Sequence, residues 1–102
     1  MGGQTTGVNE SLYPKRLKIR WRWDGDAGDF ITYQNPATGA ISILNPVAAA
    51  IFAKSTGERS AGQIADEIMQ EFDAPDRGRV LADTMEFLQF LCEIGAVRML
   101  EG

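Results

Sequence analysis

In the middle of the chain the hydrophobic pattern changes its period, and this change predicts a short strand that leads directly into a helix. Ile41 and Ile43 alternate with small or polar neighbours as far as Leu44, which is the two-residue period of a strand. Asn45 is a favoured helix N-cap, and Pro46 suits the first helical position. The alanines that follow favour the helix, so this helix must pack close to the strand that precedes it.

Two further strands are predicted before this one. The first begins at Leu17, where apolar and cationic side chains alternate as far as Trp23. Residues 30–34 are rich in β-branched and aromatic side chains, which is typical of a second strand. The short turn-rich connections between the strands predict an antiparallel meander.

Two more helices are predicted after the first. The second helix begins at Ser60 and Gln63, which have the spacing of a capping box. The third is expected from about Asp76 to Ile94. Residues 96–100 form a short apolar tail, which we expect to dock as an extended segment.

The third predicted helix has a wider apolar surface than a helix on one side of a small core needs. Its apolar side chains spread over roughly 220° of arc, whereas a stripe somewhat over about 100° wide suffices for a surface helix. Either the domain and its own tail bury both edges of this arc, or one edge is a partner-binding groove or a dimer face. Arg77 and Arg79 begin the helix, where cations oppose the helix dipole. They pair with Asp73 or Asp76, or they await an acidic partner.

Length and composition favour one small domain. The chain has 102 residues, of which 44% are hydrophobic and 24% charged. Residues 1–14 are expected to be a flexible N-terminal extension, and residues 15–100 the folded domain. No apolar run is long enough for a membrane span, and Cys92 is the only cysteine. We therefore expect a cytoplasmic protein that binds no membrane.

Few residues with catalytic or metal-binding chemistry are present. The chain has no histidine, and it lacks a phosphate-binding glycine loop. The three aspartates at 24–29 do not continue into the pattern of an EF-hand. The expectation is a protein that is not an enzyme and needs no metal or cofactor. Residues 23–102 hold 13 of the 14 acidic side chains, which disfavours nucleic acid as a partner.

The strand-to-helix region and the sequence after it resemble the PqqD-like family. These proteins are RiPP recognition elements, which act as chaperones for ribosomally made precursor peptides that are later modified. The residues that carry the resemblance are Ile43–Phe52, the turn Thr56–Ser60, Ile64–Ile68, and the run Val80–Leu88 with Gly95 after it. The chain departs from the pattern in having Thr56 where many members have aspartate, and in its N-terminal extension.

The resemblance implies an α+β fold of the winged helix-turn-helix type, with a three-stranded antiparallel sheet followed by three helices. It also implies that the leader peptide of a precursor adds as a fourth strand, in the groove between the third strand and the third helix. The peptide-binding residues would be Ala40, Ile41, Ser42, Ile43 and Leu44 on the strand, Leu81, Thr84, Met85 and Leu88 on the helix, and Arg77 at the mouth of the groove. The implied partner is a modifying enzyme, commonly a radical-SAM enzyme.

Two other functions stay open on the residues alone. A winged-helix DNA-binding regulator has the same topology, but its third helix would have to read DNA while carrying more acidic than basic side chains. A homodimeric structural module would bury the spare apolar arc against a second copy. Ser42→Pro distinguishes the edges of the third strand: it abolishes peptide binding if the Ser42 amide faces the free edge, and unfolds the domain if that amide faces inward.

Overall fold

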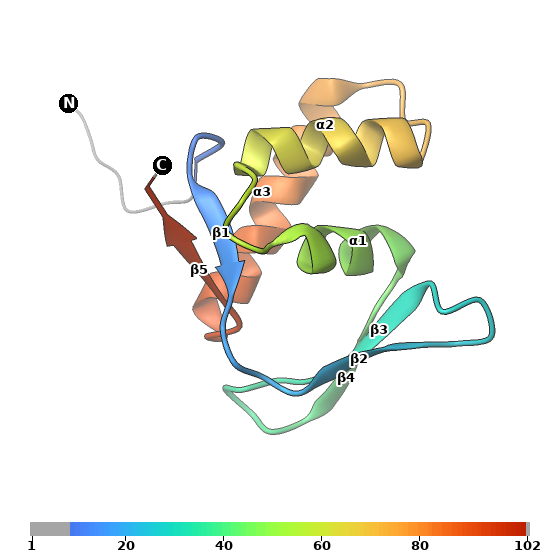
Figure 1. Ribbon diagram of the computed structural model, residues 1–102, viewed down its shortest axis with the longest axis vertical. Helices are drawn as coiled ribbons and strands as arrows, with labels where there is room; N and C mark the ends of the chain where they lie inside the picture. Colours follow the sequence, from blue (N-terminus) through green and yellow to red (C-terminus); the bar gives the residue numbers. More distant parts are fainter. Residues whose placement is uncertain (1–8, 102) are drawn as a thin grey trace.

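The structure is a computed structural model that describes residues 9–101 of the chain (Figure 1). Its elements are, in order, β1 (Tyr13–Arg16), β2 (Trp21–Asp24), β3 (Phe30–Gln34), β4 (Ile41–Leu44), α1 (Pro46–Lys54), α2 (Ala61–Glu71), α3 (Arg77–Glu93) and β5 (Val97–Leu100). The α+β prediction is confirmed, since β2, β3 and β4 form the three-stranded sheet and three helices follow it. Within the described residues, every helix is too short or too polar to cross a membrane.

The three-stranded sheet is antiparallel in the order β2-β3-β4, and its two faces differ. Ile31 and Tyr33 on β3 are buried, and so is Leu44 on β4, because this face packs beneath α1. Ile41 and Ile43 lie on the other face and are about two-thirds exposed, at 68% and 67%. The strand predicted before α1 therefore buries Leu44 and leaves both of its isoleucines outside.

The first predicted strand was wrong at its start. The chain forms β1 at Tyr13–Arg16, which pairs with β5, and it forms β2 only from Trp21 onward. Between them the chain leaves one sheet and joins the other, and this change of partner breaks the alternation that begins at Leu17. Tyr13 and Pro14 thus belong to a strand and not to a flexible extension, and Pro14 is buried. Residues 1–8 of that expected extension lie outside the described residues.

Arg16 joins β1 to the end of α1. Its guanidinium donates hydrogen bonds to the carbonyl oxygens of Phe52 and Ala53, at 3.1 and 2.6 Å. The Phe52 carbonyl also accepts from the Ser55 amide at 3.1 Å, and the C-terminal end of a helix attracts a cation. The same guanidinium lies 4.9 Å from the centre of the Trp21 ring. Partial burial lowers the pKa of Arg16, which nevertheless stays protonated.

The predicted helix caps are present. Asn45 Oδ1 accepts from the Ala48 amide at 2.9 Å, which ends β4 and starts α1 in a single residue. Ser60 and Gln63 form the capping box of α2. The core lies where the three helices meet the sheet and the tail, and its large members are Phe52, Ile31, Ile64, Leu88 and Leu91. The apolar tail docks as β5, which confirms the extended segment.

Candidate functional site

One edge of the three-stranded sheet is unpaired. In the described part of the chain, β4 pairs with β3 only. The pairing register puts Ser42 opposite Tyr33, and Ala40 lies just before the strand, where its carbonyl accepts from the Asn35 amide at 2.8 Å. Since bonded pairs alternate with non-bonded pairs in an antiparallel ladder, Ser42 and Leu44 direct their N–H and C=O groups toward β3.

Ile41 and Ile43 are the residues of β4 whose main-chain groups face outward. They occupy the non-bonded pair positions, so each directs one N–H and one C=O to the free edge. Gln34, which lies opposite Ile41 on β3, supports this assignment. Its amide donates to the carbonyl of Arg20 at 2.9 Å, on the side of β2, and not to β4. The edge therefore offers two donors and two acceptors to an added strand.

Next to the start of α1 lies an apolar cavity of about 180 Å³. It is enclosed by α1, by the end of α2 and the turn after it, and by the first half of α3. An apolar cavity of roughly 150 Å³ can hold a benzene ring, so this one is large enough for a single large side chain. Its lining residues are Val47, Ile51, Ile68, Phe72, Ala74, Val80, Asp83 and Thr84.

The cavity has apolar side chains at its rim and a polar group in its wall. Val47 and Phe72 are each 39% exposed, which is unusual for large apolar residues beside a core. Thr84 is 1% exposed, and its hydroxyl makes no hydrogen bond within the described part of the chain. A buried hydroxyl without a partner costs roughly 1–3 kcal/mol, so a polar group that reached it would bind favourably.

The structure separates the expected helical residues into different surroundings. Thr84 lines the cavity together with Val80 and Asp83. Leu81 and Met85 are half-buried and lie on the other flank of α3, turned by about 60° and about 100° from Thr84.

Two other expected positions on α3 have partners within the domain. Leu88 is completely buried in the core, so its role is packing. Arg77 is exposed, but its Nε donates to Asp66 at 2.6 Å and its Nη2 lies 3.4 Å from Glu10. We had considered Asp73 or Asp76 as the acidic partner of this arginine, and it pairs with neither of them. The reason is that α2 packs along α3 and brings Asp66 to its first turn.

Of the eight residues that line the cavity, only Thr84 was among the expected peptide-binding residues, so seven were missed. Val47 and Ile51 lie one helical turn apart on α1, and Phe72 and Val80 lie on either side of the turn between α2 and α3. The spacing of Val47 and Ile51 was a usable signal, because residues four apart share one face of a helix. Phe72 follows Ile64 and Ile68 at the spacing of one helical stripe, but at the C-cap of α2 it is partly exposed.

The described residues contain no cluster of three side chains that could bind a metal ion. Cys92 is on α3, and partial burial raises the pKa of its thiol, which keeps it protonated at neutral pH. The geometry is that of a binding edge with a neighbouring apolar cavity.

Comparison with known proteins identifies relatives of this fold. Residues 34–97 match the family model described as Coenzyme PQQ synthesis protein D (PqqD). This range contains β4, all three helices and the cavity. No curated protein matches the chain in sequence.

Two solved structures share the architecture. The PqqD truncation of Methylobacterium extorquens PqqCD, described as a stand-alone RiPP recognition element, superimposes with a TM-score of 0.69 at 23% identity, covering 91% of this chain and 96% of that one. TbiB1 in complex with the TbiA(beta) leader peptide has a TM-score of 0.59 at 18% identity, covering 91% of this chain and 95% of that one. At these identities the likeness concerns the fold.

Proposed function

The chain belongs to the PqqD family, and from this premise we propose that it is a non-catalytic recognition domain for the leader peptide of a ribosomally made precursor. The peptide adds as a fourth strand to β4, antiparallel or parallel to it, and the domain presents the peptide to a modifying enzyme. We take that enzyme to be a radical-SAM enzyme, as the resemblance implies. The domain itself acts in the cytoplasm and needs no cofactor.

The observation that carries the proposal is the free edge of β4 beside the apolar cavity. The main-chain groups of Ile41 and Ile43 supply affinity that depends little on sequence, as in other cases of strand addition. The cavity beside Val47 and Thr84 supplies selectivity, because it accepts a side chain of limited size. The leader-peptide complex of TbiB1, whose fold is similar, adds support to this function.

The DNA-binding alternative finds little support on α3. Its exposed surface carries Asp83, Glu86 and Glu93, which would face phosphates of the same sign. Arg79 lies 3.7 Å from Asp83, and Arg77 is already paired with two carboxylates. A recognition helix of this composition would repel the duplex that it has to enter.

The experiment is a calorimetric titration of the full chain with the leader peptide of the precursor encoded beside this gene. We expect one-to-one binding. A scrambled leader of equal composition is the control for nonspecific adhesion, and the cavity variant Val47→Asp is expected to weaken binding without unfolding the domain, since Val47 is 39% exposed. Equal binding of native and scrambled peptides, or full affinity in Val47→Asp, would contradict the proposal.

A further inference from the structure

A second surface of the sheet is arranged for contact with another molecule. Two cross-strand rows run over the face of the sheet that points away from α1. One row is Arg22, Thr32 and Ile43, and the other is Arg20, Gln34 and Ile41. Each row therefore has an arginine on the β2 side and an isoleucine on β4. We call the four outer residues of these rows, Arg20, Arg22, Ile41 and Ile43, the basic outer face.

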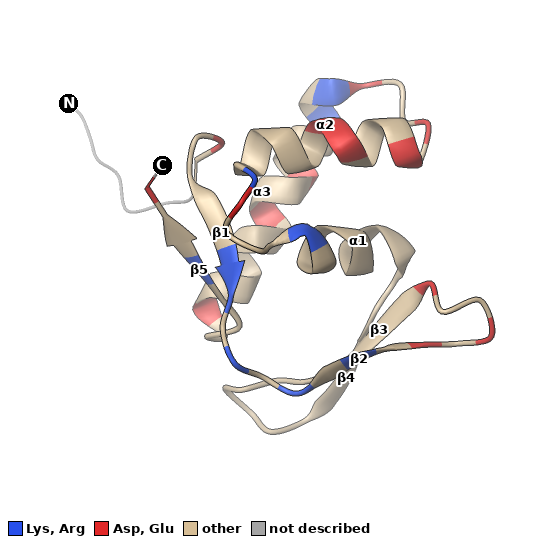
Figure 2. Ribbon diagram, in the orientation of Figure 1, with Lys and Arg blue, Asp and Glu red and all other residues tan. Residues whose placement is uncertain are grey.

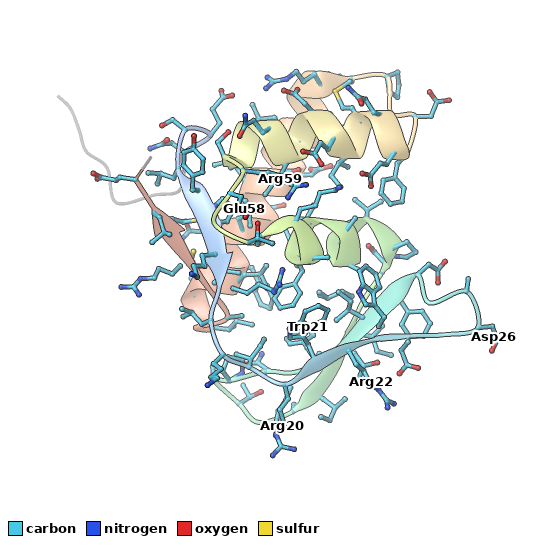
Figure 3. All side chains as sticks on the ribbon, viewed as in Figure 1. Arg20, Trp21, Arg22, Asp26, Glu58 and Arg59 are labelled. Carbon is cyan, nitrogen blue, oxygen red and sulfur yellow. The ribbon has the colours of Figure 1, made fainter. Side chains whose placement is uncertain are left out.

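The side chains of this face point into solvent. In Figure 3, Arg20 and Arg22 extend away from the body of the molecule, whereas Trp21 between them points toward α1. Ile41 and Ile43 are the most exposed large apolar side chains of the described residues. The face is also hollowed, since an open depression of about 550 Å³ extends from Arg20 and Arg22 to Ile41. Exposed isoleucines grouped in this way indicate a contact surface.

Among the described residues, the cations of this face have few acidic partners. Figure 2 shows Lys and Arg following one another from β1 through the connection to β2. Among the described residues Lys18 and Arg20 form no ion pair, and Arg22 reaches only Asp24, at 3.4 Å, with 75% of its side chain exposed.

The helical half shows the opposite behaviour, because its cations are paired. Lys54 bonds to Glu71 at 2.6 Å and to Glu67 at 3.0 Å, and Arg59 bonds to Glu67 at 2.7 Å. The carboxylates of α2 are thus used within the domain. In the described part of the chain, the basic side chains without a carboxylate partner lie on the strands and on the connection from β1 to β2, so a partner complementary to this region is acidic.

We propose that the basic outer face is a docking surface for an acidic, partly apolar patch of a protein partner, which is the modifying enzyme. This identity of the partner rests on the proposed function. The surface shares Ile41 and Ile43 with the free edge of β4, but it uses their exposed side chains, whereas an added strand uses their main-chain groups. A strand added to β4 would lie next to Ile41 and Ile43, so an enzyme docked on this face would contact the edge where the peptide is held.

The composition of the face favours protein over nucleic acid. Half of its four defining residues are aliphatic, and apolar side chains contribute nothing to phosphate binding. A second copy docked face to face would bring the exposed arginines of both copies together, and like charges oppose such a contact.

The test measures two affinities in the full chain, one for the leader peptide and one for the purified modifying enzyme encoded beside this gene. In Arg20→Glu/Arg22→Glu we expect the affinity for the enzyme to fall at least about tenfold. The peptide affinity is expected to stay within about twofold, because neither arginine lies on the free edge. Arg98→Glu is the matched control, since Arg98 is an exposed arginine on β5, outside the face. It should change neither affinity.

Each other outcome contradicts the proposal. If the double variant binds the enzyme with unchanged affinity, the arginines of the basic outer face do not contact the enzyme. If Arg98→Glu loses as much affinity, the loss comes from the change in net charge and not from this face. If a folded variant loses peptide affinity to the same extent, the two arginines also contribute to peptide binding, and the face is not a separate docking surface. Tighter binding to duplex DNA than to the enzyme, or a wild-type dimer that Arg20→Glu/Arg22→Glu dissociates, would assign the face to another occupant. If the double variant does not fold, Arg20→Gln/Arg22→Gln replaces it. Absence of leader-peptide binding by the wild type would refute the proposed function instead, and leave the enzyme measurement interpretable.

Discussion

Replacing Ile43 by proline tests the free edge of β4 at a single atom. Ile43 directs its N–H to the edge, and its side chain is 67% exposed, so the substitution removes one outward donor and little buried area. Proline is tolerated on an edge strand when its nitrogen faces outward. The lost bond and the peptide carbonyl left without a partner together cost about 1.5–3 kcal/mol. This corresponds to a roughly ten- to hundredfold weaker Kd for the leader peptide.

Ser42→Pro is the matched control one residue away. The Ser42 amide faces inward to Tyr33, which is buried, so this proline breaks the ladder within the domain. We expect a loss of at least about 2 kcal/mol in the free energy of unfolding. In a domain of this size that loss lowers the Tm by roughly 10 °C. The sequence left open whether the Ser42 amide points to the free edge or inward. In the structure it points inward, so we expect Ser42→Pro to unfold the domain.

The assay pairs thermal unfolding, followed by circular dichroism, with calorimetric titration of the leader peptide. Ile43→Pro should unfold within about 3 °C of the wild type and bind weakly. Ser42→Pro should melt early. If Ile43→Pro is folded and binds the peptide with wild-type affinity, strand addition at β4 is wrong.

Three further predictions concern stability. Thr84→Val removes a buried hydroxyl that has no partner among residues 9–101, and it should raise the free energy of unfolding by about 1 kcal/mol in chemical denaturation. A decrease would mean that the hydroxyl has a hydrogen-bond partner. Arg16→Met keeps an unbranched apolar stem but loses the guanidinium and both of its bonds to the last carbonyls of α1. It should cost about 2 kcal/mol, whereas no change would refute the capping role. The hydrogen bond from Lys54, assisted by Arg59, lowers the pKa of Glu67 in the folded chain despite opposing desolvation. The stabilisation is therefore complete above the ordinary glutamate pKa of about 4.3 and is lost as the pH falls through the lowered value. Melts between about pH 7 and pH 3 should show a smaller acid-induced loss in Glu67→Gln than in the wild type.

Local signals accounted for the parts of the fold that the sequence predicted well. Asn45 and Pro46 turn the chain from strand to helix through bonds within one turn, and Ser60 does the same for α2. Such caps depend on neighbouring residues only and can be read from spacing.

Long-range pairing explains what could not be predicted. β1 and β5 pair across more than 80 positions of the chain, and no local pattern in Tyr13–Arg16 indicates this partner. The alternation from Leu17 was interpreted as one strand, because no local signal shows that the chain changes from pairing with β5 to pairing with β3 between Arg16 and Trp21.

Only the strand of the candidate site could be expected from the sequence. A strand follows from local spacing, whereas the face of a helix that lines a site depends on how the helices pack. The sequence indicated β4 as the candidate binding strand. The two-residue period alone, however, does not say whether the face of Ile41 and Ile43 or the face of Leu44 is buried. On α3 the wide apolar arc allowed several orientations. The fold has α3 packed mainly against α2 and β5, and it leaves the flank of Val80 and Thr84 lining the cavity. That choice is tertiary, so the assignment of Leu81 and Met85 to the groove could not be checked before the fold was known.

The most direct test of strand addition is amide hydrogen exchange, measured residue by residue by NMR, with and without the leader peptide. The free domain should protect Ser42, whose amide bonds to β3, and leave Ile41 and Ile43 open to exchange. Saturation with peptide should slow exchange at Ile41 and Ile43 and shift the resonances of Val47 and Thr84. If the peptide binds while both isoleucine amides continue to exchange at the free rate, it does not bind as a strand on β4.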